Sequence, residues 1–274
     1  MSKIAWVIPG GGARSVYTAG AVAAADKSNL AKPDIIVCAS GGAGSAFYYT
    51  ASQAQEMYHV WCELLTTRKF CSLFRFWKLA NIDYLVDNVF KKQDPLNIEK
   101  IRNSKIIIYV AVNDSNTGEL KYFTNKDDIN LWQLLKATKS AWLFTGFKRG
   151  HTINHRKYCD SRISSRFEMN LLKAIELGAD KIYVFGNYHP KSSIINGKLV
   201  FKSWLLIKNK IFKKNQMRYL NIMENIKIPD NVEIFHFKPD KRLLITPWRN
   251  NRKDLIKTYM RGYNETLEKI AQLQ

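Results

Sequence analysis

The first fifty residues alternate twice between a short apolar segment and a run of small residues, with a glycine-rich turn between them. The apolar segments are Lys3–Pro9 and Asp34–Ala39, and the first run of small residues is Ser15–Lys27. A short apolar run that stops at glycine is typical of a buried strand, whereas closely spaced alanines suit a tightly packed helix. Strand, turn and helix repeated in this order build a parallel sheet covered by helices. The chain is therefore predicted to adopt an α/β fold.

The rest of the chain continues this pattern without an obvious boundary. The further expected elements are a helix from the second turn through Ser52, strands at Lys105–Val112, Lys181–Gly186 and Val232–Phe237, and helices at Asn170–Leu177 and Asp254–Leu273. The 274 residues are 46% hydrophobic, which is enough for one sizeable core, and no linker, repeat or low-complexity tract divides them. We expect a single domain over residues 1–274.

The cysteines and the apolar segments bear on the cellular location of the protein and on its need for a metal. The four cysteines form no CxxC pair, which argues against a structural zinc site and fits a reducing compartment. No apolar stretch reaches the length that spans a bilayer, and the N-terminus lacks the apolar core of a signal peptide. These features predict a cytoplasmic protein that needs no metal and no cofactor.

The formal net charge of +20 favours polyanionic partners, which are nucleic acids or anionic lipid surfaces. A lysine-rich composition on solvated faces explains the charge equally well. The clearest basic segment is Lys198–Arg218, where lysines alternate with apolar residues. This segment is either a helix lying on an anionic membrane with Trp204 at the interface, or an ordinary surface helix that packs its apolar face on the core. Since no nucleic-acid motif accompanies it, no nucleic-acid partner is expected.

The first glycine-rich turn can bind an anionic group. It consists of Gly10, Gly11, Gly12, Ala13 and Arg14, between a strand and a helix. Consecutive glycines let backbone N–H groups approach a ligand, and a helix N-terminus adds partial positive charge. Such a turn suits a phosphate, a dinucleotide or an oxyanion. The nucleotide-binding hypothesis fits less well, because the chain lacks GxxxxGK[ST] and the third glycine of GxGxxG.

The second turn, Cys38-Ala39-Ser40-Gly41-Gly42, places a serine where a strand turns sharply into a helix. This is the geometry of a nucleophile elbow, in which small flanking residues let strand and helix approach closely. Gly41 and Gly42 meet that need, while Cys38 stands where the usual pattern has glycine. A serine that merely caps a helix is the alternative. Both turns follow neighbouring parallel strands, so they should face the same end of the sheet. A turn rich in N–H donors beside an exposed serine is what acyl transfer requires.

These two turns, and segments in order along nearly the whole chain, resemble the patatin-like phospholipases, particularly their bacterial members. Gly10–Ser15 is similar to the family's Gly-Gly-Gly-x-Arg/Lys-Gly loop, Cys38–Gly42 to its Gly-x-Ser-x-Gly elbow, and Tyr158–Ser161 to the segment with its catalytic aspartate. The other matching segments are Tyr17–Gly20, Asn81–Asp87, Asn116–Glu119, Ala137–Trp142, Ala174–Ile182, Phe237–Asp240 and Tyr259–Tyr263.

The resemblance implies a three-layer α/β/α fold with a mainly parallel central sheet and a Ser–Asp dyad without histidine. Ser40 would attack an ester carbonyl of a phospholipid or another lipid, Asp160 would accept its proton, and N–H groups around Gly11 and Gly12 would bind the oxyanion. The implied activity is that of a phospholipase A, a lysophospholipase or a general carboxylester hydrolase. The five histidines are then not needed as a triad partner.

Four residues depart from the family pattern: Ser15, Cys38, Ser161 and Arg162 stand where the family has glycine or other small residues. Ser15 could narrow the oxyanion pocket or cap the following helix, and Arg162 could pair with Asp160 and weaken it as a base. The alternative hypothesis is therefore a catalytically weakened or inactive protein of the same fold that binds lipid or a membrane surface.

Overall fold

A single mixed sheet forms the centre of the molecule. The computed structural model describes residues 2–72, 74–75, 78–141, 150–161, 164, 167–188, 208–246 and 251–273. Within these residues the sheet has eight strands in the order β5-β6-β3-β2-β1-β7-β8, and β4 pairs with β3 beside this path. The strands are β1 (Ile4–Ile8), β2 (Ile35–Ala39), β3 (Ile107–Asp114), β4 (Leu120–Thr124), β5 (His151–Ile153), β6 (Arg156–Cys159), β7 (Lys181–Phe185) and β8 (Glu233–Phe237).

The sheet is mostly parallel, which confirms the predicted fold class. The strands β3, β2, β1, β7 and β8 run parallel to one another, whereas β4 and β6 pair antiparallel with β3, and β5 pairs antiparallel with β6. The register Val7↔Val37 brings the ends of β1 and β2 to the same edge. The two glycine-rich turns therefore lie side by side, as the sequence predicts.

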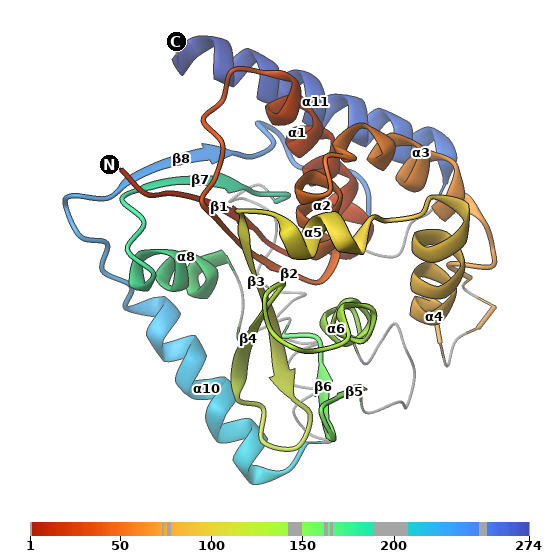
Figure 1. Cartoon of the computed structure of the whole chain (residues 1–274), viewed down its shortest axis with the longest axis vertical. Coiled ribbons are helices and arrows are strands. Elements are labelled where there is room, and N and C mark those ends of the chain that lie inside the picture. The colour runs from red at the N-terminus through yellow and green to blue at the C-terminus, as the bar shows by residue number, and fades with distance from the viewer. Residues whose placement is uncertain are drawn as a thin grey trace.

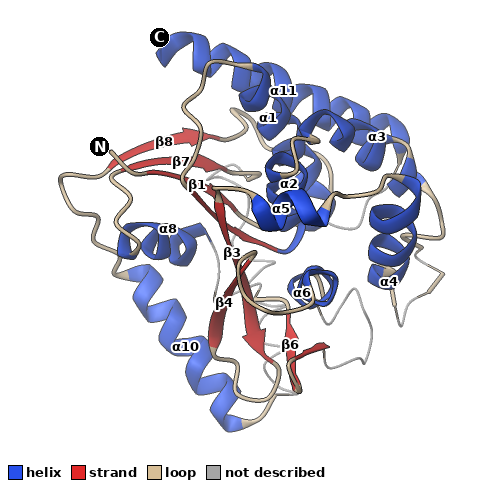
Figure 2. Ribbon diagram, viewed as in Figure 1, coloured by secondary structure: helices blue, strands red, loops and turns tan. Residues whose placement is uncertain are grey.

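Helices cover both faces of the sheet, as Figures 1 and 2 show. One face carries α1 (Ser15–Lys27), α2 (Ser40–Thr50), α3 (Met57–Cys62), the π-helix η4 (Leu85–Gln93) after the short α4 (Ile82–Tyr84), α5 (Ile98–Asn103), α6 (Leu131–Thr138) and α11 (Arg252–Leu273). The other face carries α8 (Phe167–Glu176), and α10 (Lys210–Glu224) packs beside it. This is the expected three-layer α/β/α arrangement. None of the described helices is long and apolar enough to cross a lipid bilayer.

Alternate residues of the central strands face opposite cores, because side chains of a strand point to its two faces in turn. In β1, Trp6 and Ile8 join the larger core under α1 and α2, whereas Ala5 and Val7 join the smaller core under α8. Both cores exclude water almost completely, and each fully buried aliphatic or aromatic side chain contributes about 1.5–3 kcal/mol. The strands are therefore apolar without alternation, as buried parallel strands are.

The helix α1 is buried on nearly every side, which explains its small residues. It crosses α11 so closely that a side chain at Gly20 would overlap the backbone of Tyr259, and one at Gly262 would overlap the backbone of Tyr17. The hydroxyl of Tyr17 donates a 2.7 Å hydrogen bond to Glu265 of α11. Only glycines allow two helix backbones to approach in this way.

The helix expected over Lys198–Arg218 is confirmed from Lys210 onward and corrected at its start. Residues 198–207, which include Trp204, lie outside the described residues. The helix α10 begins at Lys210, and the side chain of Asn209 caps it by accepting a hydrogen bond from the N–H of Phe212. Ile211, expected on the apolar face, is 62% exposed, while Phe212 is fully buried. Because Asn209 is an N-cap residue, the helix begins after it, and the helical spacing on which the longer helix was predicted does not continue through it.

Candidate active site

One cavity of about 260 Å³ gathers most of the residues that the sequence singled out. It lies at the edge of the sheet where β1 and β2 end. The predicted site residues that line it are Gly10, Gly11, Gly12, Ala13, Arg14, Ser40, Gly41 and Asp160. The other two predicted residues, Cys38 and Gly42, support the elbow from outside the cavity. The structure thus brings the glycine-rich turn, the serine and the aspartate to one space.

Ser40 has the backbone geometry of a nucleophile elbow. It follows the last residue of β2 and begins α2, and its φ of +50° lies in the left-handed region, which is unfavourable for serine. A Cβ atom at Gly42 would lie 2.6 Å from the carbonyl oxygen of Pro9, so the strand and helix permit only glycine there. A Cβ atom at Gly10 would lie 2.7 Å from the Cβ of Ser40. Strained backbone of this kind is found at active sites, where the surrounding structure holds it in place.

The glycine-rich turn presents backbone donors to the cavity. Gly12 has a φ of +60°, a conformation that glycine adopts without cost. Within the described part of the chain, the N–H groups of Gly11 and Gly12 donate to no other protein atom. Buried or half-buried N–H groups usually find a partner, so a ligand oxygen in the cavity is the natural acceptor.

Asn187 supports this turn, and sequence reasoning did not identify it. Its amide Nδ2 donates to the carbonyl oxygen of Gly10 at 3.2 Å and to Thr18 Oγ1 at 3.3 Å, and the side chain is almost fully buried. Any side chain at Gly11 would collide with this amide. Asn187 follows β7, the strand next to β1, and therefore lies at the same edge of the sheet as the glycine-rich turn. This position after a predicted strand is the sequence feature that could have identified it.

Asp160 lies directly after β6 and is 6% exposed. Its backbone N–H donates to the carbonyl oxygen of Ser140 at 3.3 Å. The neighbouring Ser161 is also buried, and its hydroxyl donates to the carbonyl oxygen of Ala111 on β3 at 3.2 Å. Arg162, considered above as a partner of Asp160, lies outside the described residues.

Two residues at the end of α6 contact the backbone of Ser40, and sequence reasoning gave neither of them a role. The N–H of Ser40 donates to Thr138 Oγ1 at 2.9 Å, and that hydroxyl donates to the carbonyl oxygen of Ala111 at 2.9 Å. The Nζ of Lys139 donates to the carbonyl oxygen of Ser40 at 2.8 Å. Lys139 lines the cavity at 7% exposure, and burial lowers its pKa to about 8 against the opposing attraction of Asp160. The only sequence feature that pointed to Thr138 and Lys139 was their place in the Ala137–Trp142 segment, which resembles a segment of the family.

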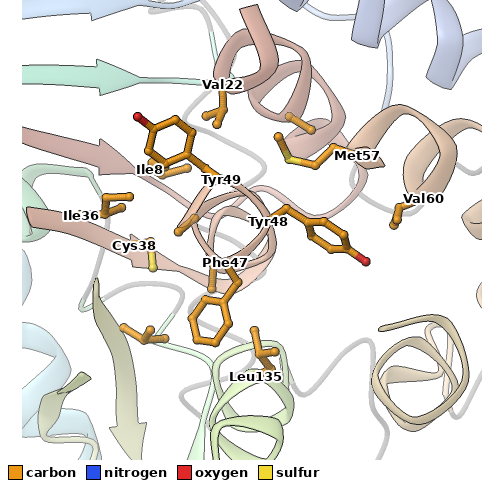
Figure 3. Close-up of a cluster of buried hydrophobic side chains, with 14 of the residues drawn as sticks. Ile8, Val22, Ile36, Cys38, Phe47, Tyr48, Tyr49, Met57, Val60 and Leu135 are labelled. Atoms are coloured by element: carbon orange, nitrogen blue, oxygen red, sulfur yellow. The ribbon is translucent and has the colours of Figure 1, made fainter. Parts of the chain in front are cut away.

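The wall of the cavity away from these polar groups is apolar. Figure 3 shows Tyr48, Met57 and Val60 in the larger core, with the ring of Tyr48 extending from α2 toward Val60. The apolar and aromatic lining residues are Tyr48, Met57, Val60, Trp61, Leu65, Phe70, Ala80, Ile82, Leu85 and Phe90. A ligand that fits this cavity has a long apolar part and a polar group near Ser40.

Three departures from the family pattern lie outside the cavity lining. Ser15 is the first residue of α1 and is fully buried. Its side chain packs closely on Gly41, because a Cβ atom built at Gly41 would lie 2.7 Å from the Cβ of Ser15. Ser15 neither caps α1 nor narrows the cavity. Cys38 is fully buried in β2, and burial raises the pKa of its thiol to about 12. Ser161 bonds to β3, as described above.

The described histidines take no part in the cavity. His59 lies 3.0 Å from Asp94, and none of His59, His151, His155 and His236 lines the cavity. Among the residues that the structure describes, no group of three or more histidine, cysteine, aspartate or glutamate side chains could hold a metal ion. The polar groups around Ser40 in this cavity include the Asp160 carboxylate, the side chains of Lys139 and Arg14, and backbone N–H groups.

Comparison with known proteins identifies the same region. The family model described as patatin-like phospholipase matches residues 6–173, which include Ser40 and Asp160. Eight chains of solved structures match the fold, among them the crystal structure of VipD from Legionella pneumophila, with a TM-score of 0.51 and 12% identity. That alignment covers 99% of this chain and 67% of VipD, and at such low identity it shows a shared fold alone. No curated protein sequence matches the chain.

Proposed function

The chain belongs to the patatin-like phospholipase family, and on that premise we propose that it hydrolyses acyl esters of lipids through Ser40 and Asp160. The observation that carries the proposal is the cavity itself, since it joins these two residues, the glycine-rich turn and an apolar wall. An acyl chain would occupy the apolar part and place its ester carbonyl beside Ser40. Phospholipids, lysophospholipids and simpler carboxylic esters all meet this requirement.

The reaction proceeds in two steps through an acyl-enzyme. The Oγ of Ser40 attacks the ester carbonyl, its proton passes to the carboxylate of Asp160, and the carbonyl oxygen becomes an oxyanion. The N–H groups of Gly11 and Gly12 donate to that oxyanion, and the partial positive charge at the start of α1 and α2 adds to their effect. The alcohol leaves with the proton from Asp160. Water then attacks the acyl-enzyme by the same route and releases the fatty acid.

The burial of Ser15, Cys38 and Ser161 outside the cavity supports the enzyme over an inactive protein of the same fold. An inactivating substitution would fill the cavity, remove a donor or occupy Ser40, and the side chains of these three residues do none of these. The cavity keeps its serine, its carboxylate and its glycines. The inactive protein that binds lipid stays the competing hypothesis, and labelling of Ser40 separates the two.

We also propose that the basic segment Lys198–Arg218 contacts an anionic membrane peripherally. Its described part supports this through the outward side of α10, where Lys210, Lys214 and Arg218 are exposed together with Ile211. Cations beside exposed apolar side chains suit a surface of anionic lipid head groups. No nucleic-acid partner is proposed.

Fluorophosphonate labelling tests the proposed function directly, because the reagent reacts only with an activated serine. We expect labelling and ester hydrolysis by the wild type, with both lost in Ser40→Ala and strongly reduced in Asp160→Asn. Ser15→Ala is the matched control, since Ser15 is a buried serine at the start of α1 that packs against Gly41 but does not line the cavity. An unlabelled wild type, or hydrolysis that persists in Ser40→Ala, would contradict the proposal.

A further inference from the structure

The three residues Thr138, Lys139 and Ser140, at and just beyond the end of α6, contact both members of the proposed dyad. Thr138 and Lys139 hold the N–H and the carbonyl oxygen of Ser40, at 2.9 and 2.8 Å, while the carbonyl oxygen of Ser140 accepts from the N–H of Asp160. One short segment therefore fixes the backbone of the nucleophile and that of the base relative to each other.

Of these contacts, the one from Lys139 is the least expected. Buried lysines are rare because an ammonium group loses its hydration, and this one retains a single hydrogen bond within the described part of the chain. Its Nζ lies 5.9 Å from the ring centroid of Phe90, in an otherwise apolar part of the cavity wall. A methionine of similar size would suit this environment better, so packing gives no reason for a lysine here.

The charged and titratable groups around Lys139 come from several elements. Asp160, after β6, attracts its positive charge, and Arg14 of the glycine-rich turn lines the same cavity. Cys38 of β2 stays neutral near pH 8, because burial raises the pKa of its thiol to about 12. Tyr48 of α2 is neutral as well, since burial raises the pKa of its phenol even further. The carboxylate of Asp160 is thus the anion identified among these neighbours.

We propose that Lys139 is a positioning residue of this hydrolase, whose ammonium group holds the carbonyl of Ser40 and so keeps the nucleophile in its left-handed conformation beside Asp160. The proposal rests on the proposed function. A charged donor makes a stronger hydrogen bond than a neutral one, and Ser40 needs such support because its φ of +50° is unfavourable.

The charge of Lys139 makes this support depend on pH. Burial lowers the pKa of Lys139 to about 8, so the ammonium form is present below that pH and is lost as the pH rises through it. The rate of acylation should therefore fall on the alkaline side. Arginine keeps its charge throughout this range, so Lys139→Arg should move the alkaline fall to higher pH, whereas Lys139→Met should abolish it at a uniformly lower rate.

The test measures the rate of Ser40 labelling by a fluorophosphonate from pH 6 to pH 10, in the wild type, Lys139→Met and Lys139→Arg. We expect Lys139→Met to label about tenfold to a hundredfold more slowly below pH 8, the effect of losing one hydrogen bond to a charged group. Its melting temperature should be no lower than that of the wild type, because the variant removes a buried charge. A purely structural lysine would give the opposite result, with lower stability and an unchanged pH profile.

Lys136, in the last turn of α6 and three residues before Lys139, provides the matched control. It is buried to a similar degree but pairs with Asp87 at 2.5 Å and with Asp83 at 3.3 Å, away from the cavity. Lys136→Met should lower stability and leave the pH profile of labelling unchanged. If the wild type is not labelled, the proposed function fails. If it is labelled and both Lys139 variants keep its rate and pH profile, the proposed function stands and the role of Lys139 is refuted.

A second inference concerns a loop at the cavity. Cys71 and Ala80 pair as an antiparallel bridge and both line the cavity, so the loop between them starts and ends at the cavity wall. Away from this base, Phe74 is 82% exposed, and the guanidinium of Arg68 lies 5.9 Å from its ring centroid. From Thr66 to Ala80 the sequence has four basic residues and no acidic one. An exposed aromatic ring among cations is chemically matched to an anionic lipid surface.

We infer that Phe74 of this loop, together with Arg68 and Lys69 just before the loop, rests on an anionic phospholipid surface and brings the cavity to its substrate. The contact proposed above for α10 is a separate one, because α10 lies on the other side of β3 and β4 from α4 in Figure 1, whereas the loop borders the cavity. The test is cosedimentation with phosphatidylcholine vesicles, with and without phosphatidylglycerol, for the wild type, Phe74→Ser and Arg68→Gln/Lys69→Gln, with Lys214→Gln/Arg218→Gln as the variant that measures the α10 contact.

We expect binding of the wild type only to the anionic vesicles, and roughly thirtyfold weaker binding of the Arg68→Gln/Lys69→Gln variant, because each cation near the surface contributes about fivefold. Hydrolysis of a soluble short-chain ester should stay unchanged in Phe74→Ser, since Phe74 does not line the cavity. Loss of binding in Lys214→Gln/Arg218→Gln alone, or equal binding by the wild type, Phe74→Ser and Arg68→Gln/Lys69→Gln, would overturn the inference. Neither result bears on the labelling of Ser40.

Discussion

The left-handed backbone of Ser40 predicts that the proposed nucleophile destabilises the protein. Serine and alanine at a φ of +50° both carry the cost of the side chain, which is about 1–3 kcal/mol in a sparsely populated conformation. Glycine carries none of this cost, but its greater freedom in the unfolded chain offsets about 0.5–1 kcal/mol of the gain. We therefore expect Ser40→Gly to be more stable than Ser40→Ala by about 1 kcal/mol.

Comparing these two variants isolates the backbone, because both lack the hydroxyl and any contact that it makes. Both also keep the hydrogen bonds of the Ser40 N–H and carbonyl to Thr138 and Lys139, since these use main-chain atoms. The difference between them then reports the cost of the left-handed conformation, less the contribution from the freedom of glycine in the unfolded chain.

Urea unfolding followed by circular dichroism measures the difference, and thermal unfolding should show Ser40→Gly melting about 2–4 °C above Ser40→Ala. Equal slopes in urea are needed for the comparison, because a changed slope indicates a changed unfolded state. If Ser40→Ala is as stable as Ser40→Gly or more so, the backbone at Ser40 is not strained, and the argument for an elbow held under strain fails.

Three further substitutions test other parts of the site and fold. Gly42→Ala should lower the free energy of unfolding by about 1–3 kcal/mol and slow fluorophosphonate labelling, because its methyl group would meet the Pro9 carbonyl; unchanged values of both would contradict the close packing at the elbow. Asn187→Ala should slow labelling about tenfold by releasing the carbonyl of Gly10, and a labelling rate equal to the wild type would show that the turn holds its shape unaided. Gly262→Ala should lower the melting temperature by several degrees without changing the labelling rate of the folded protein, because it separates α11 from α1 and neither Gly262 nor Tyr17 lines the cavity; a wild-type melting temperature would argue against the close helix crossing.

Local sequence patterns predicted the central strands and the helices that follow them. The strand at Asp34–Ala39 and the helix Ser15–Lys27 were found because apolar runs, small residues and glycine stops are properties of neighbouring residues. The helix expected at Lys198–Arg218 is confirmed over Lys210–Arg218, but its start was wrong in the described part, because helical spacing does not show that Asn209 caps a helix beginning at Lys210. The side chain of Asn209 competes with the backbone for hydrogen bonds, and the spacing of apolar residues does not depend on that competition.

The residues of the candidate site likewise divide into those that the sequence identified and those that it did not. Ser40 and the glycines around it form local motifs, and the family resemblance added Asp160 from far along the chain. Lys139 and Asn187 were missed, because each touches the site through one main-chain hydrogen bond across strands that are distant in sequence. A residue type and its spacing cannot show which carbonyl a buried amide or ammonium will meet, and only the folded arrangement supplies that information.

The two halves of the proposed dyad belong to parts of the sheet with different local stability. Ser40 follows β2, in the middle of the strand order, whereas Asp160 follows β6, which pairs with the three-residue β5 at one end of it. Short strands at a sheet edge open at a lower free energy than the core strands. We therefore expect mild denaturant to abolish the labelling of Ser40 before the sheet unfolds, so that the proposed activity would report the opening of an edge hairpin rather than the loss of the fold.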